Sequence, residues 1–261
     1  MSSTQKINNA SKKPRFLWFA TEAVRAVAEL GLSVPYRRLY KSCQEGDGHP
    51  VLVLPGFMAS DFSTGPLRQF VDSLGYHSYT WGLGRNYGQV YFLDNLVEKV
   101  ASIYKEHNQK VTIIGWSLGG IYARQLAKKN PKIVRQVITF GSPFRGITEP
   151  NNASWLYNLL PGRKRVVDLD PKLLNDLPKP ALVPTTAIYS KEDGMVPWEV
   201  CMEAEETCIH QNIQVRGSHL GLGVNPSVLE IVADRLLYSE ANWVHFRAAS
   251  IVKDLLFYPS L

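Results

Sequence analysis

The sequence predicts an α/β protein whose central sheet is mostly parallel and is covered by helices on both faces. Short apolar runs alternate along the chain with longer segments in which apolar residues recur every three or four positions. The run at 51–54 is apolar throughout, which indicates a strand that is buried on both faces. Strands and helices that alternate in this way form parallel sheets through crossover connections.

The individual elements follow from the same spacing. Strands are expected at 51–54, 76–81, 111–114, 134–140, 185–190 and 213–215. Helices are expected at 14–32, 65–74, 90–107, from Ser117 to Asn130, and at 226–238. Because sheets of this kind bind ligands at the carboxyl ends of their strands, a functional site is expected there.

The pattern divides the 261 residues into a basic segment at 1–49, a domain at 50–240 and a tail at 241–261. The whole net charge of +6 resides in residues 1–41, which hold eight Lys or Arg and two Glu. The remainder is neutral and has no basic field, so nucleic acid is not an expected partner.

Residues 144–182 interrupt the alternation of strands and helices and are rich in Pro and Asn. We interpret this stretch as a small cap insertion over the carboxyl edge of the sheet, in which Trp155 and Leu159 line an apolar pocket for the substrate. The alternative is a surface excursion that packs away from the site.

Residues 14–32 form a candidate amphipathic helix that begins at Pro14 and ends at Gly31, residue types favoured at these ends. Charged residues interrupt its apolar run and no small-residue cleavage site follows cleanly, so a cleaved signal peptide is not expected. The helix either packs on the domain or lies on a membrane surface, where Lys12 and Lys13 would meet anionic lipid.

The cysteine content is low, with Cys43, Cys201 and Cys208 only. Cys201 and Cys208 are close enough in sequence to pair, but three reduced thiols of a cytoplasmic protein are the favoured interpretation. We therefore expect a cytoplasmic location, with peripheral membrane association as one extension of it and secretion left open.

The most informative stretch is 111–120, where an apolar run leads into Gly115, Ser117 and Gly119 before a helical pattern begins. Such a strand, tight turn and helix place a serine at a strained backbone angle, and the neighbouring residues must be small so that strand and helix can approach. The hydroxyl then projects from the sheet edge as a nucleophile. The alternative is a loop serine that caps the helix.

A serine needs a base to take its proton, and the base must follow it in the chain order of this fold. His219 lies in a glycine-bearing loop directly after the last predicted strand, which places it at the carboxyl edge beside Ser117. His210 precedes that strand and would lie at the opposite edge, and His245 lies in the tail. His219 is therefore the predicted base.

An acid to orient the base is expected after the preceding strand. Asp193 stands there in an Asp-Gly turn, and Glu192 is its rival. The negative oxygen that forms during acyl transfer needs two N–H donors. We predict the backbone of Leu118 and that of Phe57, with Met58 as the alternative to Phe57.

These segments together resemble the α/β-hydrolase superfamily, and in particular bacterial triacylglycerol lipases and esterases. The likeness rests on 54–57, 115–120, 193–197, 217–219 and the Gly-Ser-Pro-Phe-Arg-Gly segment at 141–146. In the last segment, Ser142 and Phe144 replace the Thr and His usual in these lipases. The resemblance covers roughly 50–238 and implies the reaction type more strongly than the substrate.

The function that this resemblance implies is a serine hydrolase that cleaves carboxylic esters through an acyl-enzyme on Ser117. Met58, Trp116, Trp155 and Leu159 are the residues expected to bind the substrate, which is a small-molecule or lipid ester. No metal or organic cofactor is implied. An acyltransferase that uses the same residues is the alternative, and a catalytically silent binding protein is a more distant one.

Overall fold

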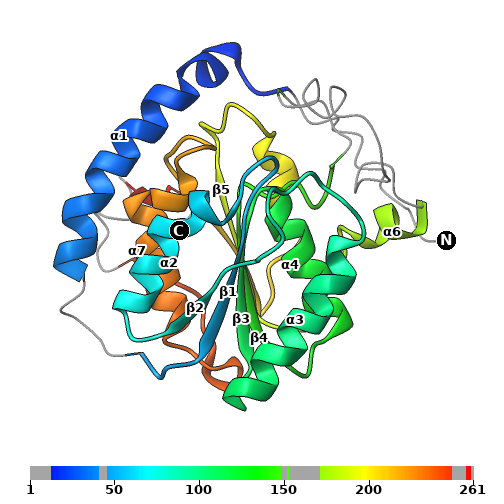
Figure 1. Ribbon diagram of the computed structural model, residues 1–261. Coiled ribbons are helices and arrows are strands. Elements are labelled where there is room, and N and C mark those ends of the chain that lie inside the picture. Colours follow the sequence, from blue (N-terminus) through cyan, green and yellow to red (C-terminus); the bar gives the residue numbers. More distant parts are fainter. Residues whose placement is uncertain (1–12, 41–45, 148–151, 153–170, 249–256, 260–261) are drawn as a thin grey trace.

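The computed structural model describes residues 13–40, 46–147, 152, 171–248 and 257–259 (Figure 1). Most of the predicted cap, including Trp155 and Leu159, lies outside these ranges, and so does Cys43. Within them the chain forms a parallel sheet with helices on both faces, as the sequence predicted.

Six parallel strands in the described part of the chain form one sheet in the order β2-β1-β3-β4-β5-β6. They are β1 (Pro50–Leu54), β2 (His77–Tyr79), β3 (Val111–Trp116), β4 (Val134–Phe140), β5 (Thr185–Ser190) and β6 (His210–Val215). The predictions for β4 and β5 are confirmed residue for residue, whereas β2 is shorter than predicted. β6 begins earlier than predicted because His210 pairs in register with Thr185.

The strand order reverses at β1. The chain passes from β1 to the edge strand β2 and then returns across β1 to β3. This reversal brings the loops that follow β1 and β3 side by side at the carboxyl edge of the sheet. In open α/β sheets ligands bind at such a point.

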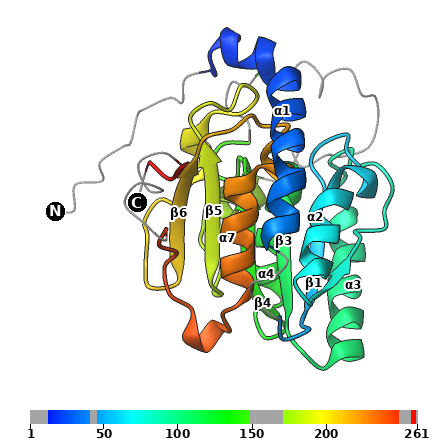
Figure 2. The ribbon, with the colours of Figure 1, turned by 90° about the vertical axis from the view of Figure 1, so that its left-hand side faces the viewer.

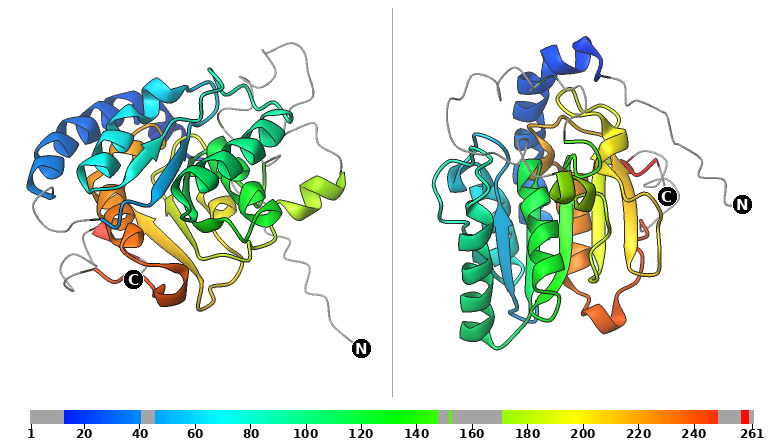
Figure 3. Two further views of the ribbon diagram at one scale, coloured as in Figure 1. Left: turned by 60° about the horizontal axis from the view of Figure 1, so that its bottom comes forward. Right: turned by 90° about the vertical axis from the view of Figure 1, so that its right-hand side faces the viewer.

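Two layers of helices enclose the sheet. The helices α2 (Asp61–Ser73) and α7 (Pro226–Leu236) cover one face (Figure 2), and α3 (Phe92–His107) and α4 (Leu118–Lys129) cover the other (Figure 3). Alternate residues of β1 supply the two cores, because Val51 and Val53 pack toward α2 and α7 while Leu52 and Leu54 pack toward α3 and α4. The remaining short elements are α6 (Pro171–Asp176), η2 (Trp198–Cys201), η3 (Leu222–Val224) and η4 (Glu240–Asn242).

The N-terminal helix α1 (Phe16–Tyr40) runs along the outside of α2 and α7 (Figures 1 and 2). The predicted end at Gly31 is wrong, because the helix continues through Pro35. Tertiary packing accounts for the extension, since the ring of Tyr40 lies 5.9 Å from that of Phe70 in the core. No helix in the described part of the chain has the length and hydropathy needed to cross a membrane.

The described residues near the C-terminus pack back on the domain. Phe246 and Tyr258 are buried with their rings 5.2 Å apart, and the Phe246 N–H donates to the side-chain oxygen of Gln211 on β6. Elsewhere, Cys201 is buried and Cys208 is exposed, and both are free thiols. The disulfide that their sequence separation allowed is therefore not formed.

Candidate active site

Ser117 occupies a sharp turn between β3 and α4, with a positive φ of 52°. An added Cβ at Gly115 would lie 2.3 Å from Gly120 Cα, and one at Gly119 would lie 2.3 Å from the carbonyl oxygen of Leu54. No side chain fits at either distance, so the glycines allow the strand and the helix to approach. The turn presents the Ser117 hydroxyl at the carboxyl edge of the sheet.

The structure brings together the three side chains that the sequence singled out for catalysis. His219 Nε2 lies 3.0 Å from Ser117 Oγ, and His219 Nδ1 lies 2.6 Å from Asp193 Oδ2. The other carboxylate oxygen of Asp193 accepts the N–H groups of Met195 and Val196, each at 2.8 Å. Asp193 is thereby held in position to accept the Nδ1 proton, which leaves Nε2 as the acceptor for the serine proton.

The three side chains are shielded from solvent, with exposed fractions of 8% for Ser117, 4% for Asp193 and 6% for His219. Burial alone would lower the pKa of His219, but the charge and hydrogen bond of Asp193, together with the charge of Glu22, outweigh it. The pKa of His219 is therefore raised above its ordinary value. This environment stabilises the imidazolium that forms when histidine takes a proton.

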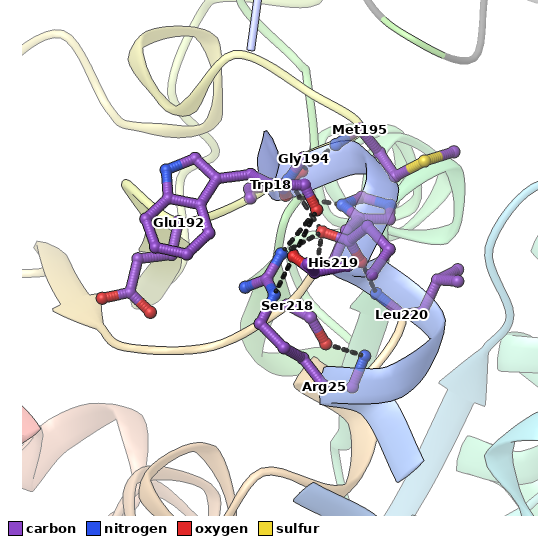
Figure 4. Close-up of polar contacts among 12 residues, drawn as sticks. Trp18, Arg25, Glu192, Gly194, Met195, Ser218, His219 and Leu220 are labelled. Carbon is purple, nitrogen blue, oxygen red and sulfur yellow. Dashed lines mark hydrogen bonds and ion pairs between the residues drawn. The ribbon is translucent and has the colours of Figure 1, made fainter. Parts of the chain in front are cut away.

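The rival acid and the rival histidines lie elsewhere. Glu192 pairs with Arg216 at 3.5 Å, and Figure 4 shows its carboxylate turned away from His219. His210 Nε2 contacts the carbonyl oxygen of Ala181 at 2.9 Å at the amino end of β6. His245 contacts a backbone carbonyl outside the site.

The loop after β1 runs directly beside Ser117. An added Cβ at Gly56 would lie 3.2 Å from Ser117 Cβ, so the backbone of this loop is in contact with the serine. The N–H of Met58 donates to the carbonyl oxygen of Asn86 at 2.7 Å and is therefore already used. This contact argues against Met58 as the oxyanion donor, and Phe57, which the sequence had ranked first, stays the prediction. Leu118 follows Ser117 as the first residue of α4.

Asn86 is a buried residue of this region that sequence reasoning did not single out. Its Nδ2 donates to the carbonyl oxygen of Pro55 at 2.8 Å, and its backbone N–H donates to the carbonyl oxygen of Ala59 at 2.8 Å. Together with the bond from Met58, these contacts fix the loop after β1. Its position in a glycine-rich loop was visible in the sequence, but its partners were not.

Trp116, which was expected to bind substrate, lies against the loop that carries His219. Its indole N–H donates to the His219 carbonyl oxygen at 3.1 Å, and its ring packs against Phe140 and Gly223. These contacts give it a role in holding the histidine loop. The other predicted substrate-binding residue in the described ranges, Met58, has a positive φ of 59° in the loop after β1.

The described residues include no group of three or more His, Cys, Asp or Glu side chains arranged to hold a metal ion. What the site can do follows from its side chains: one hydroxyl, one buried imidazole and one buried carboxylate in a hydrogen-bonded chain. Such a chain activates an alcohol oxygen for attack on an electrophilic carbon.

Comparison of the chain with known proteins gives one family match. The family model described as palmitoyl protein thioesterase matches residues 50–191, which is more than half of the chain and includes Ser117. The match ends just before Asp193, and His219 lies beyond it. No curated protein sequence matches the chain.

Solved structures of lipolytic enzymes share the fold. Aspergillus fumigatus lipase B matches with a TM-score of 0.58 and 17% identity over 78% of this chain and 54% of its own. A structure reported for the metagenome-derived lipolytic enzymes LipS and LipT has a TM-score of 0.55 and 18% identity over 74% of this chain and 93% of its own. Paleococcus ferrophilus monoacylglycerol lipase has a TM-score of 0.53 and 14% identity over 73% of this chain and 96% of its own.

This chain therefore spans about half the length of the Aspergillus lipase. At these levels of identity the likeness shows the fold alone. It confirms the predicted α/β-hydrolase architecture of a parallel sheet covered by helices.

Proposed function

We propose that this chain, which belongs to the palmitoyl protein thioesterase family, is an ester hydrolase that cleaves acyl esters or thioesters through an acyl-enzyme on Ser117. The observation that carries this proposal is the continuous hydrogen-bonded chain from Ser117 Oγ through His219 to Asp193. The description of the family favours a thioester as the bond that is cleaved, and the fold shared with lipases is equally compatible with an oxygen ester.

In the first half of the reaction, His219 Nε2 takes the proton of Ser117 as Oγ bonds to the carbonyl carbon of the substrate. The negative oxygen of the tetrahedral intermediate accepts hydrogen bonds from the backbone N–H groups of Leu118 and Phe57. His219 then gives its proton to the departing alcohol oxygen or thiol sulfur as the bond to the carbonyl carbon breaks. An acyl group remains on Ser117.

In the second half, His219 takes a proton from water as the water oxygen attacks the acyl carbon. The tetrahedral intermediate collapses, the bond to Ser117 Oγ breaks, and His219 returns the proton to the serine. Asp193 stays ionised throughout and stabilises the imidazolium of His219. A carboxylic acid and the free enzyme are the products.

An acyltransferase would follow the same first half and then pass the acyl group to an alcohol. The alternatives differ in their products, so incubation with a nitrophenyl ester and a competing alcohol distinguishes them. Free acid as the main product supports hydrolysis, and a new ester as the main product supports transfer. A silent binding protein would form neither.

The proposal is tested by labelling with a fluorophosphonate and mapping the modified residue by mass spectrometry. We expect the label on Ser117, because only an activated serine reacts rapidly. A parallel series of nitrophenyl esters and acyl thioesters of increasing chain length then identifies the preferred bond and acyl group. No label on Ser117, with no turnover of any member of the series, would contradict the proposal.

A further inference from the structure

The helix α1 turns its polar side chains toward the domain and its apolar side chains toward solvent. Between Phe16 and Pro35, every exposed residue is apolar, and we call this set of residues the outer face of α1. The exposed fractions reach 77% for Phe16, 74% for Val24 and 71% for Val27. This is the reverse of an ordinary surface helix, whose apolar side faces the core.

The reversal has a structural cause on the inner side of the helix. Glu22 and Glu29 point inward and accept backbone N–H groups of the loops after β5 and β6. Because these contacts fix the rotation of α1, the apolar side chains have no protein to cover them within the described residues. A contiguous exposed apolar face of this kind marks an interaction site.

The charges around the outer face indicate which partner fits it. Lys13 and Arg15 are exposed at its N-terminal end, beside a cavity of about 220 Å³ that Lys191, Trp18 and Trp198 also line. Cations and tryptophan next to an apolar helix face are typical of binding at the surface of an anionic bilayer. A second copy of the chain fits less well, because it would bring two strongly basic N-terminal segments together.

We propose that the outer face of α1 docks the enzyme on an anionic lipid surface. The inner side of the same helix touches the loops that carry Asp193 and His219, so docking brings the active site beside the lipid. The enzyme would then meet sparingly soluble acyl substrates at a raised local concentration. The docking itself does not depend on the proposed chemistry.

The test is co-sedimentation of the full chain with vesicles of phosphatidylcholine and phosphatidylserine in equal parts, at low ionic strength. Val24→Ser combined with Val27→Ser should lower the partition constant at least about tenfold, because two side chains lose burial in the lipid. The matched control is Leu182→Ser, which changes a leucine that is 79% exposed just before β5 and should leave binding unchanged.

Binding that is lost in the double variant and kept in the control supports the proposal. If the full chain stays in the supernatant, the proposal is overturned. Light scattering tests whether a second copy of the chain covers the outer face instead. If the wild type is a dimer, the double variant is a monomer and neither binds vesicles, the outer face is a contact between copies and the proposal is overturned.

A second inference rests on a separate observation on the inner side of α1. Glu22 is only 3% exposed. Four residues that contact it, Arg25, Gly194, His219 and Leu220, are labelled in Figure 4. Its Oε1 accepts the N–H groups of Gly194 at 2.8 Å and His219 at 3.1 Å, and its Oε2 accepts the N–H of Leu220 at 3.0 Å. Arg25 pairs with the same carboxylate at 3.0 Å.

One carboxylate thus ties together two loops that lie far apart in the sequence. Gly194 directly follows the acid Asp193, and His219 is the base itself. We infer that Glu22 is a positioning residue that holds the two loops at the separation at which Asp193 and His219 pair. This inference rests on the proposed serine mechanism.

The charge of Glu22 also acts on His219. The groups that face the imidazole are Ser117 from the turn before α4, Asp193 from the loop after β5, and Glu22, with its partner Arg25, from α1. Asp193 and Glu22 both raise the pKa of His219 against the effect of burial. Removal of the Glu22 charge should therefore lower that pKa.

Glu22→Gln tests this inference, with Glu29→Gln as the matched control. Glu29 lies on the same helix and accepts the N–H of Ser218 at 2.8 Å and the side-chain amide of Asn225 at 3.0 Å. Glu22→Gln should lower kcat about 10- to 100-fold with little change in KM, since misplaced catalytic groups cost about that much. It should also move the acid limb of the pH profile to lower pH, whereas Glu29→Gln should leave that limb in place.

A purely structural role for α1 would affect both variants alike and would leave the acid limb unmoved, which would overturn the inference. An unchanged kcat in Glu22→Gln would overturn it too. Failure of the proposed function is distinguishable, because the wild-type enzyme itself would then show no fluorophosphonate label on Ser117.

Discussion

Replacement of Asp193 by Asn is the sharpest test of the site, because the change is nearly isosteric. The remaining Oδ1 still accepts the N–H groups of Met195 and Val196, so the loop keeps its anchor. The new amide N–H₂ meets His219 Nδ1 where a carboxylate oxygen stood 2.6 Å away. Nδ1 must then accept a hydrogen bond, and the ring proton moves to Nε2.

In this tautomer Nε2 faces Ser117 Oγ as a donor and cannot take the serine proton. In enzymes that use serine, histidine and aspartate together, loss of the correct histidine tautomer lowers kcat by about 10⁴. That ratio corresponds to about 5 kcal/mol of transition-state stabilisation. The assay is steady-state hydrolysis of a short-chain nitrophenyl ester, with the melting temperature measured alongside to show that the variant is folded.

The matched control is Glu192→Gln, one residue away. Its carboxylate pairs with the exposed Arg216 at 3.5 Å, and such surface pairs contribute at most about 1 kcal/mol to stability. Its kcat should stay within about threefold of the wild type. Losses of similar size in the two variants, or a larger loss for Glu192→Gln, would refute the assignment of the acid.

Three further outcomes are expected. Ser117→Ala should lower kcat by about 10⁶ and abolish fluorophosphonate labelling while the circular dichroism spectrum stays unchanged; activity within tenfold of wild type would disprove the role of Ser117. Gly119→Ala should lower the Tm by about 10 °C, because its Cβ would lie 2.3 Å from the Leu54 carbonyl oxygen. Gly31→Ala is its control, since a Cβ there meets no atom within 4 Å, and its Tm should not fall. Finally, kcat/KM should drop as the pH falls, because protonated His219 cannot accept a proton, and the drop should be centred above the ordinary histidine pKa of about 6.5. An acid limb centred below that value would contradict the arrangement around His219.

The sequence alone determined most of the sheet and the turn that carries Ser117. The strands β4 and β5 coincide with runs rich in β-branched and aromatic residues, and the turn at Ser117 is encoded by its flanking glycines. Both features depend on neighbours a few residues apart, and such short-range preferences are legible in a single sequence. The order Ser117, Asp193, His219 followed from the order of the strands.

For other site residues the sequence offered two neighbouring candidates, and only the tertiary structure distinguished between them. Asp193 and Glu192 are adjacent in sequence, and only the position of His219 shows which carboxylate meets the imidazole. Likewise, the Met58 N–H donates to the carbonyl oxygen of Asn86, which lies in a different loop, and this contact argues against Met58 as an oxyanion donor. Contacts of this kind join distant parts of the chain, and no local pattern records them.

The helix α1 shows most clearly where local pattern and tertiary structure diverge. Its periodicity predicts an amphipathic helix whose apolar side would ordinarily face the core, but in the structure that side faces solvent. Glu22 and Glu29 set the orientation of the helix, because backbone N–H groups of the loops after β5 and β6 donate to their carboxylates. These charge-assisted hydrogen bonds outweigh the burial of Val24 and Val27 that the opposite orientation would allow. Which face of a helix turns inward depends on the free energy of its contacts with the surface on which it packs. That surface exists only once the chain has folded.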